Sequence, residues 1–233
     1  MKPVLVWDIP TRIYHWLLAA GCLAAFGLAY AAPEKSTAFD AHMLLGFLLL
    51  PLLVFRILWG VAGTKYVRFN SFLYRPGEVA AYLRETFAGK ASGHVGHNPA
   101  AGYAMIAMIV TLISAIISGI LIPGSKLFED VHETVSGLLL FLVAAHLLGV
   151  VVHMVIHKDN VIISMVHGRK TAEAGDEIGS SHLLVALALL VVTGGWGYAI
   201  VGTYDYQGRK VELPLIGITL QLPVNKESEA GDD

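Results

Sequence analysis

Long apolar runs separated by short polar stretches dominate the pattern of the chain. Five of them approach or exceed the roughly 18–20 residues that an α-helix needs to cross a membrane. They cover residues 13–30, 40–60, 101–122, 132–157 and 181–201. The fifth run is diluted by Thr193, Trp196 and Gly197. The pattern predicts an all-α membrane protein, with a four-helix transmembrane bundle and a fifth transmembrane helix.

The segments around these runs predict smaller elements. Residues 76–89 begin with a proline and place apolar side chains on one side, which is typical of a short amphipathic helix on a membrane surface. Residues 211–223 predict a short strand, and the acidic residues 227–233 are typical of disorder. The chain therefore divides into a bundle of residues 4–170, an additional helix of residues 181–201 and an extramembrane tail of residues 202–233.

Composition agrees with a membrane location. The chain has 233 residues, of which 55% are hydrophobic and 15% are charged, against about 25% charged in a soluble domain. A net charge of -2 gives no support for nucleic-acid binding. The single cysteine, Cys22, excludes an internal disulfide, a Cys-ligated iron–sulfur cluster and a covalent haem attachment motif. The first run lacks a small-residue cleavage site, so we interpret it as a retained helix rather than a signal peptide.

The basic residues give the bundle an orientation. Eleven lie at the end of the predicted bundle that holds the N-terminus, and the other five lie at the opposite end. The eleven are Lys2, Arg12, Arg56, Lys65, Arg68, Arg75, Arg84, Lys90, Lys158, Arg169 and Lys170. By the positive-inside rule the N-terminus is expected in the cytoplasm. Five spans then place the tail outside, and four would place it inside. Arg56 is close enough to the end of the second run to extend to the surface.

Four histidines lie inside the apolar runs: His15, His42, His132 and His146. Ionisable groups at membrane depth are costly and are candidates for function. The alternative is that each is a polar side chain hydrogen-bonded inside the bundle. Their spacing favours function, because His132 and His146 are 14 residues apart on one helix. They fall within about 40° of one face and about 21 Å apart along the axis.

Depth along the helices pairs these histidines. His15 is near the start of the first helix and His42 near the start of the second, so they differ in depth by roughly 20 Å. The fourth helix runs back, which pairs His42 with His132 near the outer face and His15 with His146 toward the cytoplasm. Two opposed imidazoles from different helices are the axial ligands of bis-His haem b. The sequence therefore predicts two non-covalent haem b groups whose irons are bound by these four histidines.

Two alternatives to this ligand set were weighed. His153 shares the face of His132 and His146 but lies about 31 Å from His132, which would put its haem at the headgroups. We therefore prefer His146 as the partner of His15. Four histidines could instead bind zinc or copper. One ion, however, cannot reach both pairs across about 20 Å, and the apolar surroundings suit a macrocycle better than a hydrated ion.

Several motifs in order resemble the bacterial cytochrome b561 family, which includes the b-type cytochrome subunits of nickel–iron hydrogenases. The motifs occupy residues 7–16, 41–46, 55–60, 96–99, 131–134 and 157–160. The similarity covers about residues 4–170 and implies a four-helix di-haem core in the bacterial inner membrane, with ligands at His15, His42, His132 and His146. The chain departs from the four-helix members after about Lys170.

The sequence is also similar, more distantly, to the cytochrome subunit of formate dehydrogenase. That resemblance implies a quinone near the cytoplasmic haem, beside an asparagine in the loop before the third helix. Asn98 is the corresponding residue here, with His97 next to it. Asn98 and Pro99 are equally well explained as a turn that starts the third helix.

These features favour an electron-transfer subunit. A periplasmic cytochrome c or oxidoreductase subunit would exchange electrons with the outer haem, and the inner haem would exchange them with quinone. Other expected partners are membrane lipid and either a second copy of the chain or a larger membrane complex.

A stand-alone quinone oxidoreductase acting on superoxide or another small molecule is the main alternative. The outer loops are short and nearly neutral, which argues against attraction of an anion. A haem-free membrane scaffold or transporter subunit is disfavoured by the histidine spacing.

Overall fold

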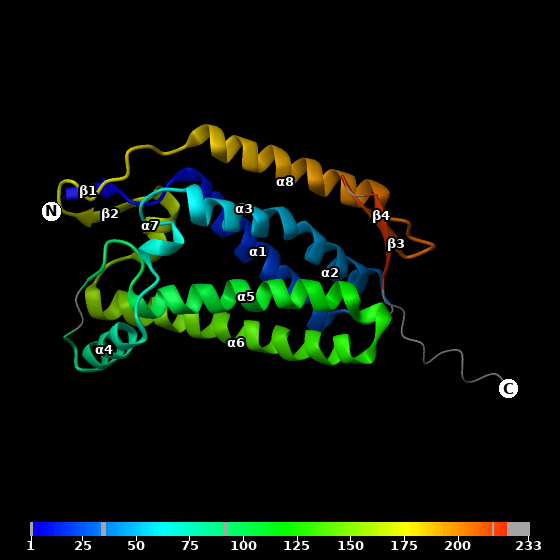
Figure 1. Cartoon of the computed structure of the whole chain (residues 1–233), viewed down its shortest axis with the longest axis horizontal. Coiled ribbons are helices and arrows are strands. Elements are labelled where there is room, and N and C mark those ends of the chain that lie inside the picture. Colours follow the sequence, from blue (N-terminus) through cyan, green and yellow to red (C-terminus); the bar gives the residue numbers. More distant parts are fainter. Residues whose placement is uncertain (1, 34–35, 91–92, 216, 223–233) are drawn as a thin grey trace.

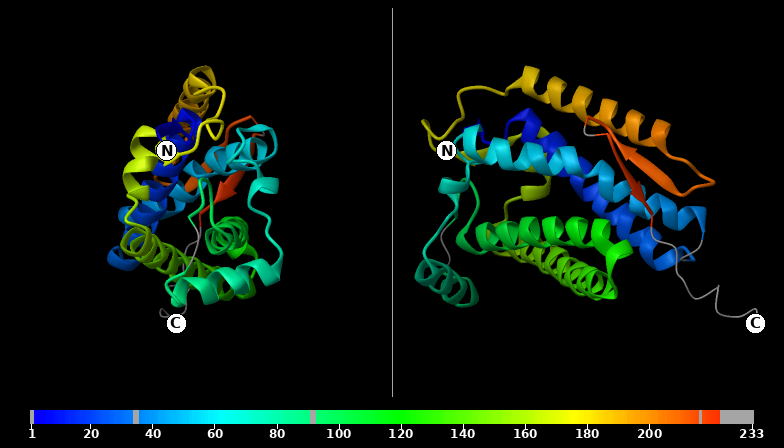
Figure 2. Two further views of the ribbon diagram at one scale, coloured as in Figure 1. Left: turned by 90° about the vertical axis from the view of Figure 1, so that its left-hand side faces the viewer. Right: turned by 45° about the vertical axis from the view of Figure 1, so that its right-hand side comes forward.

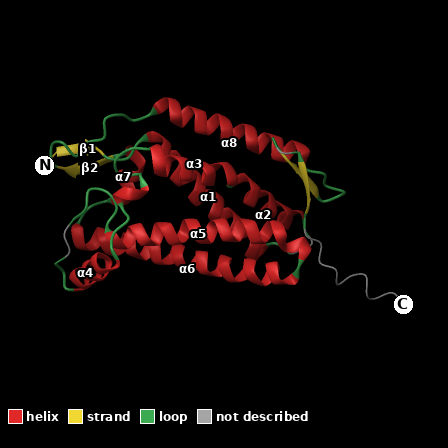
Figure 3. Cartoon of the chain, in the orientation of Figure 1, coloured by secondary structure: helices red, strands yellow, loops and turns green. Residues whose placement is uncertain are grey.

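Helices account for most of the computed structural model, which describes residues 2–33, 36–90, 93–215 and 217–222 (Figures 1 and 3). Within these residues, five helical segments are long and apolar enough to cross a membrane. They are α1 (Ile9–Ala31), α2 with α3 (Thr37–Leu48 and Leu50–Ala62), α5 (Pro99–Leu121), α6 (Lys126–His157) and α8 (Leu183–Thr203). The chain is a multi-pass membrane protein, as its hydrophobic pattern predicts.

Polar caps start two of these helices earlier than the apolar runs predict. α1 begins at Ile9 because Asp8 accepts a hydrogen bond from the Thr11 amide at 2.8 Å. α6 begins at Lys126, after Ser125, whose hydroxyl accepts from the Leu127 amide at 3.2 Å. The first turns of both helices contain polar residues, so hydropathy alone places the starts too late.

The second span is interrupted, which the apolar run did not predict. α2 ends at Leu48 and α3 begins at Leu50, with Leu49 between them. Pro51 has no N–H group, so it cannot donate the helical hydrogen bond to the carbonyl of Phe47 four residues earlier. The helical ladder is therefore broken at this point.

The spans form two groups. α5 and α6 pack along one another, while α2, α3 and α8 pack against α1 (Figures 1 and 2). An apolar core joins the groups and includes Tyr14, Leu53, Leu112, Ile116 and Leu139. Few side chains of α1 and α6 are buried by protein, although these helices carry three of the four candidate ligands.

Smaller elements cover the end of the bundle that holds the N-terminus. The predicted amphipathic helix is present as α4 (Pro76–Phe87), and its Tyr82 is buried. Strand β1 (Lys2–Leu5) pairs antiparallel with β2 (Arg169–Ala172), which follows the short helix α7 (Val161–His167). A 3₁₀ turn lies at Phe69–Ser71, and another lies at Ile122–Gly124 at the opposite end.

The C-terminal tail forms a hairpin where a single strand was predicted. Strand β3 (Lys210–Leu213) pairs antiparallel with β4 (Ile218–Gln221), and the pair lies against the last turns of α8 (Figure 1). The turn includes Gly217, whose positive φ of 62° suits glycine. The predicted disorder of residues 227–233 concerns residues outside those that the structure describes.

Candidate functional site

His42 and His132 face each other at the end of the bundle opposite the N-terminus. Their ring centroids are 6.2 Å apart and the rings are nearly perpendicular, at 81°. In each ring Nδ1 lies 2.8 Å from a backbone carbonyl, that of Ala25 for His42 and that of Ala115 for His132. A carbonyl can only accept a hydrogen bond, so Nδ1 carries the proton and Nε2 keeps its lone pair. This is the form of histidine that binds a metal.

The two rings are held in the same way by two helical hairpins. Each carbonyl belongs to the preceding helix of its hairpin, 17 residues before the histidine that it fixes. Gly119 lets α5 come close, because a Cβ there would be 3.1 Å from the His132 ring. The imidazole orientation is therefore set by backbone atoms on both sides of the pair.

The space around this pair suits a macrocycle. Metal–imidazole bonds are about 2 Å long, so one ion fits between rings at this separation. Gly46 is one turn after His42, and Gly137 is five residues after His132. A Cβ at either glycine would meet no atom of the described residues within 4 Å, so no helix of the described part of the chain fills the space next to them.

His15 and His146 form the second predicted pair, toward the N-terminal end. Both side chains are half-buried, and their imidazoles are close enough to interact electrostatically. Nδ1 of His15 is buried and has no hydrogen-bond partner in the structure. Among the described residues no backbone carbonyl therefore holds the His15 ring through Nδ1, in contrast to His42 and His132.

His153, the alternative partner of His15, lies among polar groups at the end of α6. Its ring centroid is 4.5 Å from that of His157, and its Nε2 is 3.9 Å from the Asp159 carboxylate. The same carboxylate is 3.4 Å from the ammonium group of Lys170. His153 thus belongs to a cluster of charged and polar side chains at this end of the helix.

Asn98 and His97, the candidate quinone residues, have separate local roles. Oδ1 of Asn98 accepts a hydrogen bond from the Ala101 amide at 2.8 Å and caps α5, as the helix-start interpretation predicts. The His97 ring packs between Trp7 and Phe72, with centroid distances of 5.0 and 5.1 Å. Its Nδ1 is buried without a hydrogen-bond partner in the structure.

His97 is neutral at physiological pH. Burial, together with the smaller effect of the nearby guanidinium of Arg56, lowers its pKa to about 3. His146 also acts on His97 electrostatically, so His97 lies within range of the predicted inner haem ligand. A neutral imidazole here can donate or accept a hydrogen bond without adding charge.

Arg56 does not extend to the membrane surface, and that expectation is wrong. Its side chain is only 3% exposed. It donates to the Val67 carbonyl at 3.1 Å, and its guanidinium lies 4.9 Å from the ring centroid of Phe69 and 5.6 Å from that of Phe72. The segment after α3 folds back over the helix end and encloses the charge. Hydropathy gives the depth of Arg56 but not the direction of its side chain.

The motif around His15 fixes the start of α1. Asp8 is fully buried and accepts hydrogen bonds from Trp59 Nε1 at 3.2 Å and the Thr64 hydroxyl at 2.7 Å. Trp16 donates to the Met165 carbonyl at 3.2 Å. These contacts tie α1 to the end of α3 and to α7. The sequence shows the motif but does not predict these contacts, because they join residues far apart in the chain.

The residues fit haem better than a bare metal ion. Across the described ranges, no group of three or more His, Cys, Asp or Glu side chains is arranged to hold a metal ion. Haem supplies four equatorial nitrogens itself, so two opposed histidines complete its coordination. The fixed His42–His132 pair and the open space beside it meet that requirement.

A family model described as prokaryotic cytochrome b561 matches residues 6–168. No curated protein and no solved structure matches the chain. The family match includes all four candidate ligands and ends just before β2. It leaves α8 and the β3–β4 hairpin outside.

Proposed function

The chain belongs to the prokaryotic cytochrome b561 family, which makes it a b-type membrane cytochrome of electron transfer, and we propose that it carries two haems. In this proposal the haems pass electrons across the membrane between a periplasmic redox partner and the quinone pool. His42 and His132 bind the outer haem, and His15 and His146 bind the inner haem.

The geometry of His42 and His132 is the observation that carries the proposal. Their rings face each other with Nδ1 committed to backbone carbonyls, which leaves Nε2 of each ring for iron. The second pair is supported by the partial burial of His15 and His146 and by the electrostatic interaction between their rings. His132 and His146 are separated by about 21 Å along α6, so the two haems together would span most of a hydrocarbon core of about 30 Å.

When bound, each haem accepts and releases one electron at its iron. The protein would contribute two neutral imidazoles to each iron, which would leave no open position for a substrate. In the outer pair, hydrogen bonds from Nδ1 to backbone carbonyls hold the imidazole planes. These are the properties of an electron carrier rather than of an iron site that binds small molecules.

For the quinone we propose the inner end of the bundle. Eleven basic residues at the N-terminal end favour a cytoplasmic N-terminus in the bacterial inner membrane. At that end His97 offers a buried, neutral ring between aromatic side chains, within electrostatic range of His146. A quinone ring suits such an aromatic and weakly polar site. Asn98 supports the same loop by capping α5.

A comparison of two variants on α6 tests the ligand set. His146→Ala should remove one haem, whereas His153→Ala, on the same helix face, should retain both. Haem per chain is measured by the pyridine haemochrome assay on purified protein. Loss of a haem in His153→Ala with two haems retained in His146→Ala would reverse the assignment. Fewer than two haems in the unaltered chain after full haem supply would refute the di-haem proposal.

A further inference from the structure

α8 and the β3–β4 hairpin, here called the C-terminal module, lie outside the family match and contact the helix that carries His42. α8 runs along α1, α2 and α3, and its last turns and the hairpin lie at the start of α2 (Figures 1 and 2). The contacts between the module and α2 are specific at three points.

The first point is the break between α2 and α3. Trp196 of α8 donates from Nε1 to the carbonyl of Phe47 at 2.9 Å. This is the carbonyl that Pro51 cannot serve, because proline has no N–H group. The Phe47 carbonyl thus accepts from Trp196 as well as from the backbone N–H of Leu49, so the module is bonded directly to the backbone at the end of α2. Carbonyls at this depth are costly unless they have donors.

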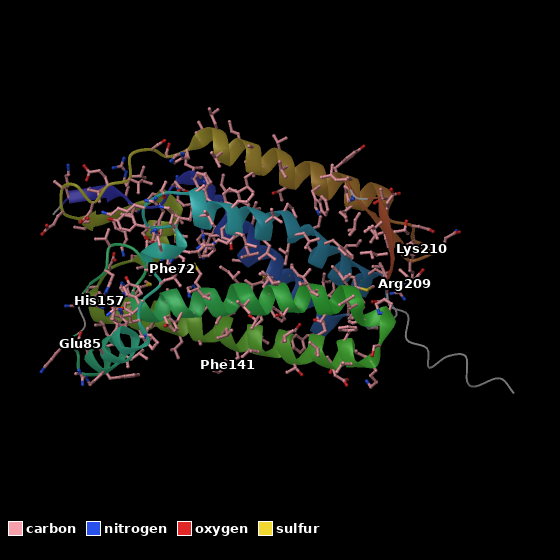
Figure 4. All side chains as sticks on the ribbon, viewed as in Figure 1. Phe72, Glu85, Phe141, His157, Arg209 and Lys210 are labelled. Carbon is pink, nitrogen blue, oxygen red and sulfur yellow. The ribbon has the colours of Figure 1, made fainter. Side chains whose placement is uncertain are left out.

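The second point is the first turn of α2. Asp40 is 5% exposed, and its carboxylate accepts a hydrogen bond from the Tyr204 hydroxyl at 2.6 Å. The other carboxylate oxygen pairs with Arg209, which Figure 4 shows at this end of the bundle. Burial and the carboxylate raise the pKa of Tyr204 to about 12, so the hydroxyl keeps its proton and donates. A buried carboxylate requires such partners.

The third point is an apolar core between the module and the same face of α2. It contains Phe47, Ile200, Val211, Leu213 and Leu222, and Ile200 and Val211 are fully buried. Asp40 and Phe47 are seven residues apart and share one face of α2, whereas His42 is about 200° around the helix from Asp40. The module thus holds one face of α2 while His42 projects from the other toward His132.

We infer that the C-terminal module positions His42 as a ligand of the outer haem. It does so by holding the face of α2 opposite His42, through Trp196, Tyr204 and Arg209. α2 has only 12 residues and is separated from α3 by the break at Leu49. Without these contacts it could tilt and change the angle at which the imidazole meets the iron. The inference rests on the proposed function, because it takes His42 as a haem ligand.

The test compares the unaltered full chain with a Trp196→Phe/Tyr204→Phe double variant, which loses two donors but keeps an aromatic side chain at each position. The control is Tyr198→Phe, a change at an exposed tyrosine of the same helix. Redox titration and low-spin electron paramagnetic resonance signals report on each haem separately. We expect the outer haem's reduction equilibrium to change about threefold, about 30 mV at 59 mV per tenfold. The inner haem and the control should not change.

The outer haem is identified in the His146→Ala background, which should retain only that haem. A lower melting temperature with both potentials and both signals unchanged would show that the module only stabilises the fold, and would overturn the inference. Equal shifts of both haems would also overturn it. If the double variant does not accumulate, Tyr204→Phe alone is judged by the same criteria. Failure of the proposed function is distinguishable, because the unaltered chain would then hold fewer than two haems.

Discussion

Arg56 places a positive charge inside the protein near the inner histidine pair. His97 senses both Arg56 and His146 electrostatically, so the guanidinium and the proposed ligand share one region. A nearby positive charge disfavours ferric haem, which carries one more positive charge than ferrous haem. Arg56→Gln should therefore lower the potential of the inner haem. An interaction of about 1.4 kcal/mol corresponds to about 60 mV for a one-electron couple.

Redox titration of the purified protein measures this change. Arg68→Gln is the matched control, since Arg68 is exposed in the segment that follows α3. It should leave both potentials within about 10 mV, because exposed charges are strongly screened. An unchanged inner haem in Arg56→Gln, or an equal shift of the outer haem, would contradict this account of the buried charge.

At the residue scale, depth and spacing predict the candidate histidines but not what holds them. His132 and His146 stand out because polar residues are rare in an apolar run. The carbonyls of Ala25 and Ala115 carry no such signal, because every residue has a carbonyl and its partner depends on how the helices meet. The direction of Arg56 could not be predicted for the same reason.

The start of α1 is an element whose position depends on one side chain. Asp8 caps the helix and accepts from Trp59 and Thr64 while fully buried. Asp8→Ala removes the cap and leaves those donors unpaired, which should lower stability by about 2–4 kcal/mol. The measurement is a thermal melt of the purified protein, followed by haem absorbance.

Asp8→Asn separates capping from charge. Asparagine caps helices nearly as well as aspartate when its oxygen accepts from the Thr11 amide, and its NH₂ group can then donate to the Thr64 hydroxyl, which can accept instead of donating. We expect it to lose less than half of the stability lost by Asp8→Ala. Equal losses in the two variants would mean that the negative charge, rather than the hydrogen bonds, stabilises this end of α1.

The sequence predicts the helices better than it predicts the breaks between helices or the strands. Apolar runs identify the five spans because lipid requires about 20 apolar residues in each. Pro51 is a sequence signal for the break at Leu49. A proline is also tolerated in the first turn of a helix, however, so it does not by itself predict a break. β1 pairs with β2 although the two strands lie far apart in the sequence. Each strand has only four residues, which is too short to show the alternation of apolar and polar side chains typical of a strand.

At the scale of the whole molecule, the four core spans act as two similar hairpins. α1 with α2 and α5 with α6 each present a histidine whose Nδ1 is held by the preceding helix. The proposed haems lie between the hairpins, which explains why α1 and α6 bury so few side chains against protein. The C-terminal module packs mainly against the hairpin with the broken helix, and its apolar core also contacts Ile120 of α5.

Five crossings would place the N-terminus and the β3–β4 hairpin on opposite sides of the membrane. Residues 63–90, 93–98 and 158–182 contain eight of the sixteen lysines and arginines and lie at the N-terminal end of the bundle, and the β3–β4 hairpin lies at the other end (Figure 1). The positive-inside rule then predicts a cytoplasmic N-terminus and a periplasmic tail. Protease added to spheroplasts should remove a C-terminal tag and leave an N-terminal tag intact, as read by immunoblot. Inside-out vesicles should give the reverse. Protection of both tags in spheroplasts would mean that α8 does not cross. The hairpin would then lie on the cytoplasmic side and could not contact Asp40, which would contradict the structure at this end.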